Sequence, residues 1–407
     1  MTHVDEAQAL LLALLAPANR ADPYPLCAQL RDYGPVVLPD ANLVVFSSYR
    51  DCDEVLRHPS SANDRDKSTI VQRQLRKDPA RVAERMPGFL FLDPPDHTRL
   101  RSLVSKAFVP KVAGALQPEI TTLVAALLDR IAERGRFDVV ADLAYPLPVA
   151  VICRLLGVPL DDEPKFSHAS ASLVQMLDPF VSLRGELPDG FEERMRAGRW
   201  LREYLTALVE ERRSHPGEDL MSRLIAVEES GDQLTQDEIV AICSLLLIAG
   251  HETTVNLIAN AVLAMLRDPG QWAALSVNAD HAAAVVEETL RYDPPVQLVA
   301  RIAAEDMAIG EVCVPHGDTM LLLLAAAHRD PAEFERPEVF DPNRKPFRHL
   351  GFGRGLHFCI GAPLARLEAA VALSALTARF PNARLIGEPQ YKPNFTLRGL
   401  SSLPVQI

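Results

Sequence analysis

A long apolar segment at residues 235–267 constrains the fold of this chain most. The run Thr-Gln-Asp-Glu at 235–238 fits a helix capping box, and Asp-Pro-Gly at 268–270 ends the helical pattern. A helix over this span is roughly 50 Å long at 1.5 Å per residue. Because residues 239–248 are apolar almost all round, we expect the helix to lie buried in the middle of the protein. The apolar run is too short to cross a bilayer.

The centre of this predicted helix breaks the local rules. Residues 249–254 read Ala-Gly-His-Glu-Thr-Thr. Gly250 costs about 1 kcal/mol in a helix interior, and the Glu252 carboxylate needs partners if it is buried. A kinked core helix with a satisfied polar cluster is one explanation. The zinc motif His-Glu-x-x-His is excluded, because its last position is Val255.

A second unusual stretch, Phe352–Gly361, reads Phe-Gly-Arg-Gly-Leu-His-Phe-Cys-Ile-Gly. Its closely spaced glycines indicate a sharp bend or a close approach of the backbone. A helix-forming run with proline in its first turn follows at 363–370. This order places Cys359 just ahead of a helix N-terminus, where amides and the helix dipole favour a thiolate. A small buried cysteine at a loop-to-helix junction is the simpler reading of these residues alone. A dinucleotide-binding loop is excluded, since the third glycine and a βαβ unit are missing.

The stretch fills every fixed place of the pattern Phe-Gly-x-Gly-x-His-x-Cys-x-Gly, followed by Leu-Ala-Arg, and so resembles the cysteine loop of the cytochrome P-450 family. Ordered motifs carry the resemblance from about residue 90 onward. The resemblance implies a mainly α fold with a small β region and heme b between the central helix and the helix after the loop. Cys359 would be the axial thiolate, with Phe352, His357 and Gly361 around it.

Residues 249–253 resemble the oxygen-activating motif of that family, Ala-Gly-x-(Asp/Glu)-Thr. By this resemblance, Ala249 and Gly250 leave room for dioxygen. Thr253 would hold a hydroxyl or water against the oxygen, and Glu252 would replenish protons from bulk water. Leu245, Ile248 and Ala249 would face an apolar substrate.

Two further groups of residues follow from the resemblance. His97 and Arg101 lie four apart and share a helix face, in a helix for which Asp96 is the expected N-cap. They would hold the haem propionates, as would Arg301 and His357, because buried carboxylates need donors and countercharge. The second group, Glu288, Arg291 and Arg344, is expected to form a buried ion network that supports the cysteine loop. His328 stands where many relatives carry asparagine, which we expect to matter little.

The chain has no recognisable linker or repeat, so we expect one domain over residues 1–407. Its β-rich parts are expected at about 30–50, including a hairpin at 36–46, and at 296–325 and 383–407, with helices elsewhere. Residues 60–92 lack clear periodicity, and residues 165–200 resemble a helix–loop–helix lid over the substrate entrance.

Composition limits the class of protein and the cellular compartment. Apolar residues make up 48% of the chain and charged residues 24%, as in globular proteins, and the net charge of −12 argues against binding nucleic acid or an anionic membrane. The six cysteines are scattered without a Cys-x-x-Cys pair, which favours a reducing cytoplasm. Acidic residues precede the apolar run at 10–16, so neither a signal peptide nor a membrane anchor is expected. We expect a monomer.

The resemblance therefore predicts a haem-thiolate monooxygenase that inserts one oxygen atom of dioxygen into an apolar small molecule. NAD(P)H electrons would arrive through a ferredoxin and its ferredoxin reductase, docked on a basic patch of Lys106, Arg354 and Arg366. A peroxide-driven oxygenase is less consistent with the sequence, because those relatives carry Arg-Pro in place of Glu252-Thr253. A non-catalytic haem-binding or gas-sensing protein is the alternative from another class.

Overall fold

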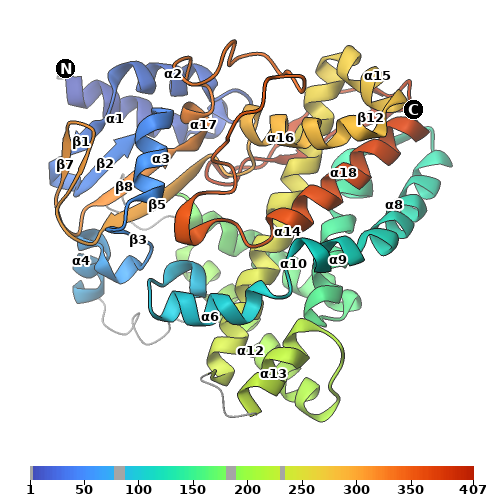
Figure 1. The fold of residues 1–407 in the computed structure, drawn as a ribbon, viewed down its shortest axis with the longest axis horizontal. Coiled ribbons are helices and arrows are strands. Elements are labelled where there is room, and N and C mark those ends of the chain that lie inside the picture. The colour runs from blue at the N-terminus through green and yellow to red at the C-terminus, as the bar shows by residue number, and fades with distance from the viewer. Residues whose placement is uncertain (1–2, 78–87, 180–188, 230–233) are drawn as a thin grey trace.

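A long helix, α14 (Gln236–Arg267), runs through the middle of the protein and the other helices gather around it (Figure 1). We describe a computed structural model, which defines residues 3–77, 88–179, 189–229 and 234–407. The remaining helices are α1 (His3–Leu14), α2 (Tyr24–Tyr33), α3 (Tyr49–Arg57), α4 (Thr69–Lys77), α6 (Asp96–Ser105), α7 (Pro110–Ala115), α8 (Gln117–Ala132), α9 (Pro146–Leu156), α10 (Glu163–Val174), α12 (Phe191–Ser214), α13 (Leu220–Glu229), α15 (Pro269–Val277), α16 (Ala282–Tyr292), α17 (Leu324–Ala327) and α18 (Ala362–Arg379).

The predicted start of the central helix is confirmed. The Thr235 hydroxyl accepts a hydrogen bond from the backbone amide of Glu238, and the Glu238 carboxylate accepts one from the amide of Thr235. By length and composition α14 is long and apolar enough to cross a membrane, but most of it is buried inside the fold. It packs against α9, α12, α16 and α18, as expected for a core helix.

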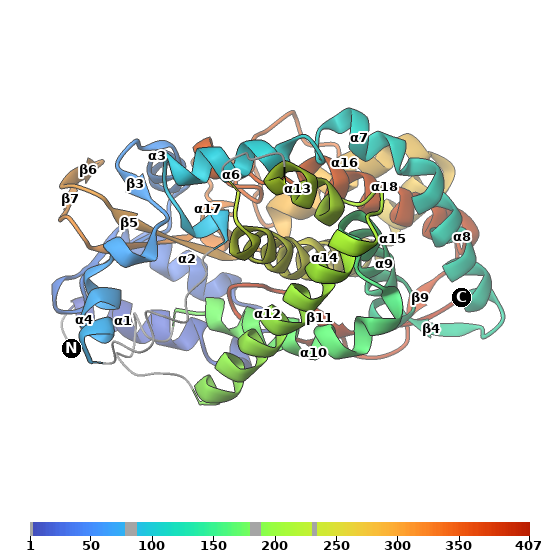
Figure 2. The ribbon, with the colours of Figure 1, turned by 90° about the horizontal axis from the view of Figure 1, so that it is seen from below.

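A five-stranded sheet lies beside the helical body, toward the N-terminal end of the chain (Figures 1 and 2). Its strand order is β1-β2-β8-β5-β3, in which β2 and β8 are parallel and the other neighbouring pairs are antiparallel. Its strands are β1 (Val36–Leu38), β2 (Leu43–Phe46), β3 (Ser61–Ala62), β5 (Leu298–Ala303) and β8 (Thr319–Leu323). The predicted hairpin at 36–46 is therefore correct and forms one side of this sheet.

Both faces of the inner strand β2 are buried, which explains its continuous apolar sequence. Leu43 and Val45 pack in a cluster that includes residues of α1 and α2. Val44 and Phe46 point the other way, into a cluster that includes residues of α3. The alternation of side chains along the strand thus fixes the sheet between two helical layers.

Smaller β pairs complete the fold. These are β6 (Met307–Ile309) with β7 (Val312–Val314), β10 (Gln390–Tyr391) with β11 (Leu400–Ser402), and β12 (Pro404–Gln406) between β4 (Arg136–Asp138) and β9 (Arg384–Leu385). Most of these strands fall in the predicted β-rich ranges. The strand β4 does not, because its only partner is a segment far along the chain, which local periodicity does not report.

The structure corrects two expectations. Residues 60–92 are not uniformly irregular, since they include β3 and α4; residues 78–87 lie outside the described residues. Hydrogen bonds to the turn before β8 and to β8 itself hold the start of α4: the Thr69 amide donates to the Gly317 carbonyl at 2.9 Å, and the Ser68 and Thr319 hydroxyls lie 3.0 Å apart. Asp96 is the first residue of α6 and caps nothing. In the predicted lid, α10 and α12 are present, whereas 180–188 lie outside the described residues.

The buried stripe of α18 contains a carboxyl group, that of Glu368, which is 3% exposed. Among the described residues its Oε2 has no hydrogen-bond partner. Burial raises the pKa of Glu368 from 4.5 to about 8, because the charged form is poorly solvated there. The folded chain therefore binds one more proton than the unfolded chain between these two values.

We predict that the free energy of unfolding falls as pH rises from 4.5 to about 8, and that Glu368→Gln lowers this slope. The variant keeps the neutral side chain at every pH, so it should be relatively more stable at the alkaline end. Urea denaturation at several pH values measures the slope. Glu311→Gln, at an exposed carboxyl, should leave it unchanged. Equal slopes for Glu368→Gln and the parent would contradict the prediction.

Candidate functional site

The cysteine loop is a tight structure whose shape depends on two glycines. Gly353 and Gly355 have φ of 68° and 64°, a region that favours glycine. A Cβ on Gly355 would also lie 2.9 Å from the carbonyl oxygen of Leu56 in α3. The Cys359 amide donates to the Phe352 carbonyl at 2.8 Å, which closes the loop. Cys359 thus stands just ahead of α18, as predicted, with Gly361 at the helix N-cap.

Two opposing effects act on the thiol of Cys359. Burial raises its pKa, while the backbone amides of Gly361 and Ala362 and the nearby cations Arg101 and Arg366 lower it. Burial is the larger effect, so the helix terminus alone does not make this cysteine a thiolate. A metal cation beside the sulfur removes that penalty, because a coordinating thiol is deprotonated outright.

Buried donors without acceptors gather next to this loop. Both ring nitrogens of His97 and Nδ1 of His357 lack hydrogen-bond partners among the described residues. The centroids of the two rings lie 4.2 Å apart and their planes are tilted by 45°. Burial lowers the pKa of both, that of His357 to about 3 with help from His97 and Arg301.

Arg301 of β5 belongs to the same cluster. It is 7% exposed, and burial lowers its pKa to about 10. Its guanidinium donates to the Ala300 carbonyl at 2.8 Å but forms no ion pair with any carboxylate in the described part of the chain. A buried guanidinium beside two neutral imidazoles is a site that an anion stabilises. These residues fit the carboxylates of a haem, which would also raise both histidine pKa values.

Arg101 lies beside the cysteine loop, and its contact with a propionate stays a prediction. Its guanidinium donates to the Phe358 carbonyl, so it lies against the peptide that precedes Cys359. Phe352 packs edge-on against Phe358, and the guanidinium of Arg366 lies 4.5 Å from the centre of its ring. Arg101 and Phe352 therefore shape the loop around the cysteine in this structure.

The predicted ion network is present, and its two central members are completely buried. Arg291 makes a two-pronged ion pair with Glu288, at 2.6 and 2.9 Å, and both side chains have no exposed surface. Arg344 approaches the same carboxylate at 3.4 Å. The Arg291 guanidinium also donates to the carbonyls of Pro337 and Val339. The network thereby ties α16 to the irregular segment ahead of the cysteine loop.

His328 matters more than the sequence suggested. It is fully buried, and its Nε2 accepts a hydrogen bond from the Leu350 amide at 2.7 Å. Its carbonyl accepts another from Arg291. Burial keeps its pKa well below the ordinary value, so the ring is neutral and can accept. The expectation that His328 is peripheral is wrong, because it links the ion network to the start of the cysteine loop.

One face of α14 is open although the helix is otherwise buried. Leu245, Ile248 and Thr253 are only partly buried, and Ala249 between them is exposed. Spacings of three and four residues put them on one side of the helix. The Thr253 hydroxyl donates to the Ala249 carbonyl at 2.9 Å. The predicted substrate-facing residues are therefore brought together on this open face.

Gly250 serves a different purpose from the one expected. A Cβ there would lie 2.9 Å from Cδ1 of Ile152, so the missing side chain admits α9 rather than a ligand. The Thr254 hydroxyl donates to the Gly250 carbonyl at 3.2 Å, as local back-bonding predicts.

Glu252 has a partner that sequence reasoning missed. Its carboxylate is 8% exposed and forms an ion pair at 2.6 Å with Lys392, which follows β10 near the C-terminus. The same ammonium donates to the side-chain oxygen of Asn256 at 3.1 Å. No local pattern reports this pair, because the two residues are 140 positions apart.

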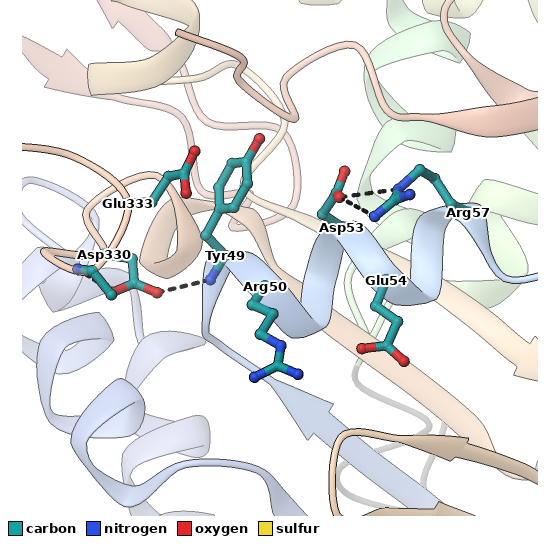
Figure 3. Close-up of a pocket in the computed structure, with 8 residues that line it drawn as sticks. Tyr49, Arg50, Asp53, Glu54, Arg57, Asp330 and Glu333 are labelled. Carbon is teal, nitrogen blue, oxygen red and sulfur yellow. Dashed lines mark hydrogen bonds and ion pairs between the residues drawn. The ribbon is translucent and has the colours of Figure 1, made fainter.

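The expected basic patch carries less free charge than the sequence suggests. Arg366 forms an ion pair with Glu287 at 2.6 Å, and Arg354 forms one with Asp53 at 3.3 Å. Lys106 is exposed, but both arginines are neutralised by carboxylates. The surface hollow beside Asp53 in Figure 3 lies apart from the predicted site residues. It is lined by charged groups of both signs from α3 and from 330–333, of which Asp53 and Arg57 are paired.

The mainly α fold thus brings Cys359, ahead of α18, next to unpaired histidine nitrogens, an arrangement that suits a bound haem. A family model described as Cytochrome P450 matches residues 31–383. Cytochrome P450 107B1 of Saccharopolyspora erythraea is 40% identical over 377 residues, or 89% of this chain and 88% of the relative. Vitamin D(3) 25-hydroxylase of Pseudonocardia autotrophica is 39% identical over 394 residues, or 95% and 94%.

A solved structure agrees with these relatives. Ligand-free CYP164A2 of Mycobacterium smegmatis is 66% identical to this chain, with a TM-score of 0.94. The superposition covers 98% of this chain and 100% of that one. The econazole-bound form of that protein matches equally well. The chain belongs to the cytochrome P450 family and is a monooxygenase of the bacterial type.

The ion network yields a prediction about stability and haem retention. Arg291→Met leaves the buried Glu288 carboxylate without its main partner, which should cost about 3–5 kcal/mol. We expect a lower urea midpoint and less haem per protein, measured from the ratio of Soret to protein absorbance.

Arg57→Met is the matched control, because Arg57 also pairs with a carboxylate at 2.6 Å but its side chain is 61% exposed. Such surface pairs contribute little to stability. If both variants lost the same stability and haem, the network would not have the supporting role assigned to it.

Proposed function

We propose that this protein is a haem-thiolate monooxygenase that inserts one oxygen atom of dioxygen into an apolar small molecule. The observation that carries the proposal is the placement of Cys359 ahead of α18, next to buried histidines and an arginine that lack an anion. Hydroxylation uses dioxygen, two electrons and two protons to convert a C–H group into an alcohol and one water. Epoxidation uses the same reagents to convert a C=C group into an epoxide and one water.

The bound heme b supplies an iron that the cysteine thiolate makes competent for O–O cleavage. Cys359 would hold the iron, while His97, His357 and Arg301 would bind the propionates. Thr253 on the open face of α14 would present its hydroxyl to the reacting oxygen. Glu252, one residue earlier, would pass protons inward from water.

External redox proteins would supply the electrons. We propose a ferredoxin and a ferredoxin reductase, with NAD(P)H as the source. The docking face would include the exposed apolar side chains of Leu356 and Phe358 beside the cysteine, since Arg354 and Arg366 already have carboxylate partners. We further propose that the chain acts as a single-domain monomer in the cytoplasm, which its free cysteines and net charge of −12 support.

The substrate class follows from the open face of α14. Leu245 and Ile248 offer only apolar contact there, which suits lipids, terpenoids, steroids or polyketides. Similar structures are described in complex with testosterone and with myristic acid. Titrating these two compounds against the ferric protein and following the Soret band tests the proposal. A shift identifies a ligand, and its absence with both would argue against steroids and fatty acids.

Two other functions fit less well. A peroxide-driven oxygenase of this family replaces the acid–alcohol pair by Arg-Pro, whereas this chain keeps Glu252 and Thr253. A gas sensor does not need to deliver protons, so it does not require the buried carboxylate of Glu252 next to the hydroxyl of Thr253. Oxygen consumption driven by NADH, a surrogate ferredoxin and its reductase separates an oxygenase from a sensor.

We predict that Cys359→Ser abolishes the red-shifted band of the ferrous–carbon monoxide complex, because that band depends on the axial thiolate. Absorbance difference spectra measure it directly. The control Cys313→Ser changes an exposed free cysteine and should keep the band. Survival of the band in Cys359→Ser would overturn both the ligand assignment and the proposed function.

A further inference from the structure

The segment after β10 brings a lysine against the polar centre of α14. The ammonium of Lys392 lies 2.6 Å from Oε2 of Glu252 and 3.1 Å from Oδ1 of Asn256. Glu252 is 8% exposed and Asn256 is fully buried, whereas the Lys392 side chain is 20% exposed. The pair therefore leads from the interior of the helix toward solvent.

The position of Lys392 is built into the C-terminal hairpin. Its amide donates to the Gly399 carbonyl at 3.0 Å, which continues the pairing of β10 with β11. Gly399 in turn lies so close to α14 that a Cβ there would be 1.9 Å from Oδ1 of Asn256. Only glycine allows this approach. The backbone of the hairpin therefore fixes the position of Lys392 next to Glu252.

The other side chains near the pair do not replace the lysine. His251 precedes Glu252 on α14, but burial lowers its pKa, and its Nδ1 is engaged with the Leu247 carbonyl at 2.6 Å. Tyr145 faces the His251 ring edge-on and donates to Glu163. In the described part of the chain, Lys392 is the one cation in an ion pair with Glu252.

We propose that Lys392 is the positioning residue for proton delivery, holding the carboxylate of Glu252 in place beside Thr253. The inference rests on the proposed function, because it assigns to Glu252 the transfer of protons from water to reduced oxygen. A buried carboxylate needs a paired countercharge. The ammonium of Lys392 supplies one and engages one oxygen of the carboxylate, Oε2. The carboxylate would accept a proton relayed through water from bulk solvent and pass it to the reduced oxygen, so Glu252 returns to its starting form and Lys392 gains and loses no proton.

Substitutions at the pair test the proposal. Lys392→Met removes the ammonium and keeps most of the apolar stem, and Lys392→Arg keeps the charge. The exchanged pair Glu252→Lys with Lys392→Glu preserves the attraction but leaves no carboxylate at position 252 of α14. Lys165→Met is the control, since that lysine also lies 2.6 Å from a carboxylate but is 62% exposed.

The first measurement needs no turnover. Urea unfolding of Lys392→Met, Glu252→Gln and the double variant gives the coupling between the two residues. We expect the double variant to lose less stability than the sum of the single losses. Additive losses would mean that the ion pair is absent in solution and would overturn the proposal.

The second measurement is the rate of NADH oxidation with a surrogate ferredoxin and its reductase, in H2O and in D2O, with testosterone or myristic acid present and without either. We expect Lys392→Met to slow oxidation by about tenfold or more and to raise the H2O/D2O rate ratio. Lys392→Arg should recover most of the rate, while the exchanged pair should recover stability without rate. Lys165→Met should behave as the parent.

A merely structural lysine gives a different result. The solvent isotope ratio of Lys392→Met would then stay that of the parent even where its stability falls, which would overturn the proposal. Failure of the proposed function is distinguishable, because the parent would then lack the red-shifted carbon monoxide band or consume no oxygen. An active parent with an unaffected Lys392→Met variant would contradict the inference alone.

Discussion

The ion pair between Glu288 and Arg291 is the interaction on which the site most depends. Each side chain is removed completely from water, and each satisfies the other with two hydrogen bonds. Arg291 spends its remaining donors on backbone carbonyls of the segment that leads to the cysteine loop. Two glycines in the left-handed region give the loop little stability of its own. Its geometry therefore depends on the hydrogen bonds that this pair and His328 make to the segment ahead of it.

Two kinds of incompleteness mark the site. His97 and Arg301 are buried and His357 is half-buried, none of them paired with an anion in the described part of the chain, and Ala249 is exposed in the middle of a buried helix. Buried polar groups in proteins are nearly always paired. The clustering of exceptions beside one cysteine is what distinguishes a cofactor site from ordinary core packing.

Much of this was predictable because it is local. The capping box, the break at residues 249–254 and the glycines around Cys359 are written within a few residues of each other. The Glu288–Arg291 pair spans one helical turn, and its place in the network came from resemblance rather than from spacing. What failed involved distant partners: Ile152 fills the space at Gly250, Lys392 reaches Glu252, and β4 pairs with β12. Charge patterns failed for the same reason, since Arg354 and Arg366 meet carboxylates from other elements.

The inner strand β2 has a consequence for how the protein is made. It is paired early with β1, but its other edge waits for β8, which begins at Thr319. During synthesis the chain therefore presents an open apolar strand edge until β8 has been made, a template for unwanted pairing. Cys359, and Lys392 that pairs with Glu252, emerge later still. A haem held by Cys359 would therefore be captured late and could contribute no stability to the nascent chain before then.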